Sequence, residues 1–299
     1  MSPWIVASLI LTAALLLFTP VASTFQFPDN SGEVNRTTIT VPVAPLPVGK
    51  NLPVPAVSAR NVFIMDQNSR TVLWSRNPDE EVLPASTTKM MTALVILEKF
   101  NLTDPITVTT EYNVGQHIGF KPGETLTVEQ LLYALLVQSA NDAAEVLAQN
   151  YPGGRPAFIA AMNAKAQEIH LSNTHFVNPS GVDEQGHYST AADLARLADV
   201  ALRHPVFAKI VATENAVVAT HVLTNVNQLL GKIPGVIGIK TGYTEGAKQA
   251  LVTLVKRDDH PVILVVLGSD DRFADSAALI DWVYSDFDWE MPLANTPGQ

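Results

Sequence analysis

Apolar and polar positions along the chain predict strands near both ends of a folded unit. Residues 62–65 and 71–74 are β-prone apolar runs separated by turn-forming residues, which predicts a hairpin. Residues 250–255 and 262–267 are two further apolar runs around a short polar turn. We expect all four runs to be β-strands, because each is short, apolar and bounded by turn chemistry.

The middle of the chain shows helical spacing instead. Residues 90–97 are apolar apart from one threonine, which is typical of a helix buried on all sides. Thr127 and Gln130 form a capping-box pattern before a leucine-rich helical segment. Residues 158–169 and 194–202 repeat apolar side chains every three to four positions. These segments predict a helical region between the two pairs of strands.

Two features complete the expected fold. Pro205 should end the helix that precedes it, and a last helix is expected over residues 274–284. Residues 236–239 read as a short strand. Strands that open and close a unit around a helical middle are typical of an α+β fold, in which the terminal strands pair in one largely antiparallel sheet.

The N-terminal part of the chain indicates export. Residues 4–22 carry no charge and are largely apolar, so we expect residues 1–23 to be a signal peptide or an N-terminal membrane anchor. The protein should then be extracytoplasmic, either secreted or held at the cytoplasmic membrane. Residues 24–57 are proline-rich and predict an extended linker, although a strand or strap lying against the domain is an alternative. The catalytic domain is expected over 58–290 and a short tail over 291–299.

Composition removes several functional classes. The chain has 299 residues, is 47% hydrophobic and has a formal net charge of −10, which argues against nucleic-acid binding. It has no cysteine, so disulfides, thiol nucleophiles and cysteine-based metal sites are excluded. Its seven histidines form no zinc-type spacing. We therefore expect neither a metal nor a cofactor.

The first candidate for chemistry is the pair Ser86 and Lys89. Pro84 suits the start of a helix, so both side chains should lie on one face, one turn apart. A serine hydroxyl is a weak nucleophile until a base takes its proton. A lysine acts as that base only when burial or a second cation lowers its pKa. The apolar helix that follows supplies such a setting.

Two further motifs fit the same chemistry. Ser139 and Asn141 stand where one helix ends and another begins; the hydroxyl could relay a proton, and the amide could hold the lysine and a peptide substrate. Lys240, Thr241 and Gly242 follow the short strand at 236–239. The first two could hold a substrate carboxylate. The glycine would let a substrate backbone lie against the strand.

The three motifs, in this order and at element boundaries, carry a resemblance. The chain resembles the serine D-Ala-D-Ala carboxypeptidases, the low-molecular-mass penicillin-binding proteins of the DD-peptidase/β-lactamase superfamily. The resemblance extends over about residues 58–288 and includes further short matches at 83–92, 123–132, 173–181 and 188–195. It implies a five-stranded sheet packed by helices, with a helical lobe that bears Ser139.

The resemblance also implies residue roles. Ser86 would be the acyl-ester nucleophile and Lys89 its general base, with Ser139 as proton shuttle and Asn141 positioning lysine and substrate. Lys240 and Thr241 would bind the terminal carboxylate, with Gly242 beside them in the substrate-binding strand. The backbone N–H groups of Ser86 and Tyr243 would form the oxyanion hole.

The function implied is removal of the terminal D-alanine from peptidoglycan stem peptides through an acyl-enzyme. β-Lactam antibiotics would acylate the same serine. A D,D-endopeptidase acting on cross-linked peptidoglycan would use the same residues. Two weaker alternatives are a serine β-lactamase, for which Glu168 is the one motif-like carboxylate, and a catalytically silent wall-binding module. The N-terminal apolar segment would provide any membrane attachment.

Overall fold

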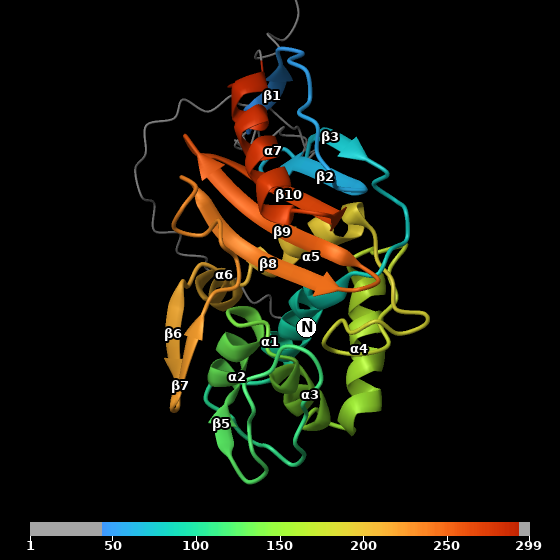
Figure 1. Ribbon diagram of the computed structural model, residues 1–299, viewed down its shortest axis with the longest axis vertical. Coiled ribbons are helices and arrows are strands. Elements are labelled where there is room, and N and C mark those ends of the chain that lie inside the picture. Colours follow the sequence, from blue (N-terminus) through green and yellow to red (C-terminus); the bar gives the residue numbers. More distant parts are fainter. Residues whose placement is uncertain (1–43, 293–299) are drawn as a thin grey trace, which may run out of the picture. The chain divides into compact units, whose positions relative to one another are not determined.

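A five-stranded antiparallel sheet dominates one half of the computed structural model, which describes residues 44–292 (Figure 1). The strand order is β3-β2-β10-β9-β8, so the N-terminal pair β2 and β3 lies beside the three C-terminal strands of this sheet. The bounds are β2 Asn61–Asp66, β3 Val72–Arg76, β8 Val236–Thr244, β9 Lys248–Arg257 and β10 His260–Ser269. The expected hairpin and the late strand pair are confirmed.

Helices cover both faces of the sheet. Alternate residues of β10 face opposite sides: Ile263 and Val265 join one apolar core, and Val262 and Leu264 join the other. The first core includes α5 Ala191–Leu202 and the helical lobe, and the second includes α7 Arg272–Asp286. Figure 1 shows α7 in front of the sheet and α5 behind it.

The helical lobe lies beyond the edge strand β8 (Figure 1). Its helices are α1 Lys89–Lys99, α2 Val128–Leu136, α3 Asn141–Gln149, α4 Gly154–Glu168 and α6 Pro205–Val211. Helix α1 is buried from its first residue through Leu97, as its all-round apolar sequence predicts. Thr127 and Gln130 form the predicted capping box at the start of α2. The predicted α+β fold with a five-stranded sheet and a helical lobe is thus confirmed.

Part of the stretch expected to be a linker is folded. The compact unit runs Leu46–Glu290, and β1 Leu46–Gly49 pairs with β11 Phe287–Glu290 in a two-stranded ribbon. Beyond β1, the backbone N–H of Leu52 donates to the carboxylate of Asp286 at 2.5 Å. A two-stranded ribbon leaves each strand one free edge, so the prolines of this segment are tolerated there. The boundary expected at residue 58 is therefore corrected to residue 46, in favour of the strap alternative. The expected signal peptide or anchor at 1–23 lies outside the described residues.

Several smaller elements differ from the sequence expectations. The strand expected at 236–239 continues to Thr244 as β8, so the Lys240 motif lies inside a strand rather than after it. Helix α5 ends at Leu202, before Pro205 as expected, and Pro205 then begins the short helix α6, which was not expected. Short hairpins were not predicted: β4 Pro105–Thr107 with β5 Thr125–Thr127, and β6 Asn215–Val218 with β7 His221–Thr224. Within residues 44–292, no helix combines the length and apolarity needed to span a membrane.

Candidate active site

Ser86 lies in a strained, tightly held turn at the start of the central helix. It belongs to the 3₁₀ helix η1 Ala85–Thr88 directly before α1, not to the first turn of α1 as expected. Ala85 has a left-handed φ of +48°, a conformation unusual for a residue with a side chain. A Cβ placed on Gly181 would lie 1.8 Å from the Ala85 carbonyl oxygen, so only glycine fits against this turn. Ser86 remains partly accessible while its neighbours are buried.

Lys89 is fully buried and holds three polar partners. Its Nζ lies 2.8 Å from the Ser86 Oγ, 2.6 Å from the Asn141 Oδ1 and 2.7 Å from the Ser180 carbonyl oxygen. The amide oxygen and the carbonyl oxygen can only accept hydrogen bonds, whereas the serine hydroxyl can donate. A protonated amine donates one N–H to each of the three, whereas a neutral amine can keep two N–H groups on Asn141 and Ser180 and accept the Ser86 hydroxyl proton with its lone pair.

The electrostatic surroundings favour that neutral amine. Burial lowers the pKa of Lys89 well below its usual range, and the charge of Lys240 lowers it further. The carboxylates of Asp142 and Glu145 act in the opposite direction on the same pKa and are the smaller influences. The spacing of Ser86 and Lys89 thus brings nucleophile and base into contact in a site where the base can accept a proton.

Ser139 and Asn141 occupy the sharp junction between α2 and α3. Ser139 has a left-handed φ of +60°, which turns the chain abruptly between the two helices. Asn141 bridges two parts of the site: its Oδ1 accepts from Lys89, and its Nδ2 donates to the Val114 carbonyl at 2.9 Å. The carboxylate of Asp142 accepts backbone N–H groups from the same loop, at residues 118–120. This loop is thereby fixed over the lobe side of the site.

Lys240 enters the site from the edge strand β8. Its Nζ donates to the Ser139 Oγ at 2.8 Å and to the Thr241 carbonyl at 2.9 Å. Burial and the neighbouring Arg272 guanidinium lower the pKa of Lys240 to about 7. Thr241 is buried beside it, whereas the Tyr243 side chain is 63% exposed. One lysine therefore contacts Ser86 and the other contacts Ser139, at one site between sheet and lobe.

Gly242 has a structural reason besides the expected one. A Cβ on this residue would lie 3.0 Å from the Ala85 Cβ and 3.2 Å from the Ser86 backbone nitrogen. The missing side chain therefore makes room for the turn that carries the nucleophile, which the sequence motif did not reveal. Strand β8 thereby passes close to the backbone nitrogen of Ser86.

Two site residues were missed by sequence reasoning. Ser180 contributes only its carbonyl oxygen to Lys89, so its residue type carries no signal. Arg272, at the start of α7, donates to the Gly242 carbonyl at 2.6 Å, and its Nε is buried without a partner within the described residues. It supplies the second cation at the Lys240 end of the site.

The carboxylates that could activate water for rapid hydrolysis of an acyl-enzyme are paired with other groups. Glu168 is 66% exposed at the end of α4 and pairs with Lys165 at 2.7 Å. Glu145 pairs with Arg155 at 2.9 Å. Asp142 accepts three backbone N–H groups. This pattern disfavours the β-lactamase alternative.

Comparison with known proteins agrees with this geometry. Residues 49–271 match the family model described as D-alanyl-D-alanine carboxypeptidase. The chain belongs to this family. The match covers both Ser86 and Lys240, and it also begins within the ribbon strand β1 that was first taken for linker.

Individual members of the D-alanyl-D-alanine carboxypeptidase family show the same relation. The chain is 34% identical to the D-alanyl-D-alanine carboxypeptidase DacF of Bacillus subtilis, over 80% of this chain and 66% of DacF, just under two thirds of that protein. It is 37% identical to a D-alanyl-D-alanine endopeptidase of Pseudomonas aeruginosa, over 81% of each. A crystal structure of a D-alanyl-D-alanine carboxypeptidase from Mycobacterium tuberculosis superposes with a TM-score of 0.75 at 32% identity, covering 83% of this chain and 100% of that one.

Proposed function

We propose that this protein is a serine D-alanyl-D-alanine carboxypeptidase that removes the terminal D-alanine from peptidoglycan stem peptides. The observation that carries the proposal is the contact between a buried lysine with a lowered pKa, Lys89, and the partly accessible hydroxyl of Ser86. A base within hydrogen-bond reach of a hydroxyl nucleophile is the arrangement that acyl transfer requires.

Acylation follows from the positions of these atoms. The Ser86 Oγ attacks the carbonyl carbon of the penultimate D-alanine while its proton passes to the Lys89 Nζ. The resulting oxyanion is stabilised by backbone N–H groups of Ser86 and Tyr243. When the tetrahedral intermediate collapses, the C–N bond breaks, and the proton that Lys89 accepted passes by way of the Ser139 hydroxyl to the amine of the departing D-alanine. Water then hydrolyses the acyl ester and regenerates Ser86.

The cationic end of the site accounts for specificity toward a free carboxylate. Lys240 and Arg272 lie next to each other, and Thr241 adds a hydroxyl beside them. A substrate that ends in a carboxylate neutralises this buried positive charge, and charge-assisted hydrogen bonds of this kind are worth about 1.5–3 kcal/mol. The carboxylate of a β-lactam would meet the same groups, which would place its ring carbonyl for attack by Ser86.

An endopeptidase activity is the second candidate, because one relative with that activity is 37% identical over 81% of this chain. The same catalytic residues would cleave a D-alanyl bond whose amine belongs to a neighbouring stem peptide. Assaying the protein on monomeric pentapeptide stems and on cross-linked dimers separates the two activities.

The cellular location belongs to the same proposal. A cell-wall substrate requires an extracytoplasmic enzyme, which the uncharged apolar stretch at residues 4–22 supports. We expect that stretch either to be cleaved on export or to anchor the protein in the cytoplasmic membrane. Sequencing the N-terminus of the protein from the membrane and soluble fractions of the producing cell tests both.

Intact-mass spectrometry after treatment with benzylpenicillin tests the proposed function. The protein should gain the mass of one penicillin molecule, and peptide mapping should place it on Ser86. Ser86→Ala should gain none, while Ser75→Ala, which changes an exposed serine on β3, should react like the unchanged protein. An adduct of undiminished amount on Ser86→Ala would overturn the assignment.

A further inference from the structure

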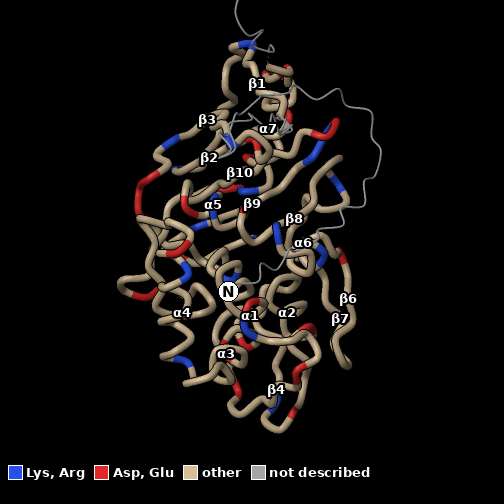
Figure 2. Tube along the Cα trace, turned by 180° about the vertical axis from the view of Figure 1, so that it is seen from behind, with Lys and Arg blue, Asp and Glu red and all other residues tan. Residues whose placement is uncertain are grey.

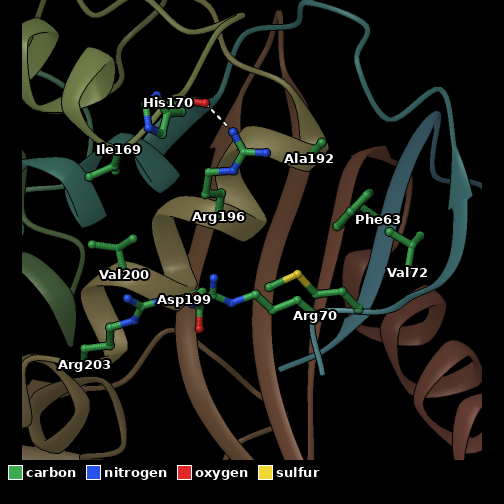
Figure 3. A pocket seen from close by; sticks show the side chains of 11 residues that line it. Phe63, Arg70, Val72, Ile169, His170, Ala192, Arg196, Asp199, Val200 and Arg203 are labelled. Atoms are coloured by element: carbon green, nitrogen blue, oxygen red, sulfur yellow. Dashed lines mark hydrogen bonds and ion pairs between the residues drawn. The ribbon is translucent and has the colours of Figure 1, made fainter. Parts of the chain in front are cut away.

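A second recess lies away from the active site, beside helix α5 (Figure 3). Its volume is about 450 Å³, in the usual range for small-ligand sites. It is bounded by α5, by strands β2 and β3, and by the C-terminal end of α4. None of the residues that line it belongs to the catalytic cleft.

The recess combines an apolar floor with a cationic rim. Phe63, Met65 and Val200 are among the apolar side chains that line it. Its charged lining is three arginines against one aspartate, namely Arg70, Arg196, Arg203 and Asp199. The local balance is positive although the chain as a whole has a formal charge of −10. Figure 2 shows basic and acidic residues interspersed along the trace, so this local excess is not part of a broad basic face.

The arginines are held in place but not neutralised. Asp199 is buried and pairs with Arg203 at 2.6 Å and with Arg70 at 3.5 Å. Arg196 donates to the backbone carbonyl of His170, and among the described residues it makes no ion pair. Figure 3 shows the Arg196 guanidinium reaching toward His170 at one side of the recess. A single carboxylate thus positions two guanidinium groups, and a main-chain oxygen positions the third.

We propose that this recess binds an acidic peptide, namely a second peptidoglycan stem next to the one being cleaved. The inference rests on the proposed function, because that function supplies a polymer with repeated acidic peptides. Guanidinium groups pair well with carboxylates, and the apolar floor suits the methyl groups of alanine residues. A recess of this size holds a few amino-acid residues. A membrane surface is flat, so it would reach the three arginines at the rim but not the apolar floor. The site would raise activity on the polymer without taking part in bond cleavage.

The direct test measures binding with the active site blocked. The protein is first acylated with benzylpenicillin and then titrated with an N-acetylated alanyl-glutamyl-lysyl-alanine tetrapeptide of stem stereochemistry, whose carboxylates outnumber its one ammonium group. The double variant Arg70→Gln/Arg196→Gln should bind the peptide about tenfold more weakly, as expected for the loss of two partly exposed ion pairs. Arg60→Gln/Lys256→Gln removes two exposed charges outside the recess and should bind normally. A tetrapeptide with amidated carboxylates should bind to none of them.

A second variant guards against misfolding of the first. Ala192→Glu keeps every arginine and places a carboxylate in the lining, and it should also weaken peptide binding. In both recess variants, D-alanine release from a short soluble peptide should stay unchanged, while release from polymeric peptidoglycan should fall. Unchanged peptide binding in both variants would overturn the proposal. The proposal would also be overturned if the unchanged protein bound phosphatidylglycerol vesicles but not the tetrapeptide, and if the recess variants lost that vesicle binding. That result would assign the recess to a membrane.

The two proposals fail in different ways. If penicillin left no adduct and no D-alanine were released from any substrate, the proposed function would be wrong. The tetrapeptide titration of the recess variants would still report on the recess, since none of their changes touches the catalytic cleft.

Discussion

The Nζ of Lys240 lies 2.8 Å from the Oγ of Ser139, although 101 residues separate them along the chain. One comes from the edge strand of the sheet and the other from the junction of two lobe helices. Their contact ties the sheet to the helical lobe at the candidate active site.

Lys89→Arg tests the assignment of the general base. The guanidinium keeps the charge and much of the volume but does not give up its proton at any usable pH. We expect the variant to fold and to acylate with benzylpenicillin at least about a hundredfold more slowly, in the range typical for loss of general-base catalysis. Stopped-flow or quenched mass spectrometry measures this rate. Acylation at the unchanged rate would transfer the role of base to another group, with Ser139 as the first to examine.

The pH dependence of kcat/KM should report both lysines. Because Lys89 acts as a base, acylation should rise with pH as its lowered pKa is passed. Because Lys240 binds a carboxylate as a cation, binding should weaken above pH about 7, where the free enzyme loses that charge. A bound carboxylate stabilises the protonated form, so kcat should show the alkaline decline at higher pH than kcat/KM.

Arg272→Gln provides the control for this profile. The Arg272 guanidinium is one cause of the lowered pKa of Lys240, so its removal should shift the alkaline decline to higher pH. The maximum of kcat/KM should also fall, since a cation near the carboxylate is lost. An alkaline limb that stays in place would show that Lys240 does not produce it.

Sequence reasoning found the local parts of this site and missed the parts that depend on tertiary contact. Ser86 and Lys89 are three residues apart, so helical geometry alone places them together. Arg272 gave no comparable signal, because only the packing of α7 against the sheet brings it to Gly242. For the same reason the packing role of Gly242 was not foreseen: the atoms that crowd a side chain there belong to a turn far away in the sequence.

The fold shows the same division. Apolar periodicity predicted the sheet strands and the main helices, since each buries one face or its whole surface. The proline-rich segment before residue 58 was taken for linker because proline density favours extended chain. Its pairing with β11 depends on a strand at the other end of the domain, which local composition does not encode.

Two truncated chains test the corrected domain boundary. A chain beginning at Leu46 should retain the stability of the folded unit. A chain beginning at Ser58 loses the β1–β11 ribbon and the Leu52 N–H that donates to buried Asp286. It loses that hydrogen bond, whose net contribution is about 0.5–1.5 kcal/mol, together with the packing of Val54 and Val57 on the second core, so its urea midpoint should be lower. Equal midpoints would show that residues 46–57 add nothing to the fold.

Acid stability should depend on one buried histidine beside the nucleophile's helix. The His187 Nε2 lies 2.8 Å from the Thr88 Oγ1, and its Nδ1 accepts the Val177 N–H at 3.2 Å. The neutral ring with its proton on Nε2 satisfies both contacts, whereas a second proton on Nδ1 would oppose the Val177 N–H. Burial lowers the pKa of His187 from its usual 6.5 to about 4.

The sign of the effect follows from that shift. The unfolded chain takes up the proton at higher pH than the folded protein does, so folding stability is fully present above pH about 6.5 and is lost as the pH falls toward 4. The loss from this residue should be on the order of 3 kcal/mol across that interval. His187→Asn should be less stable near pH 7, because it loses ring contacts, yet its stability should decline less steeply over the same interval. His117→Asn changes an exposed histidine and should keep the full slope. Urea unfolding at a series of pH values measures all three proteins, and equal slopes for His187→Asn and the unchanged protein would assign the acid sensitivity to carboxylates instead.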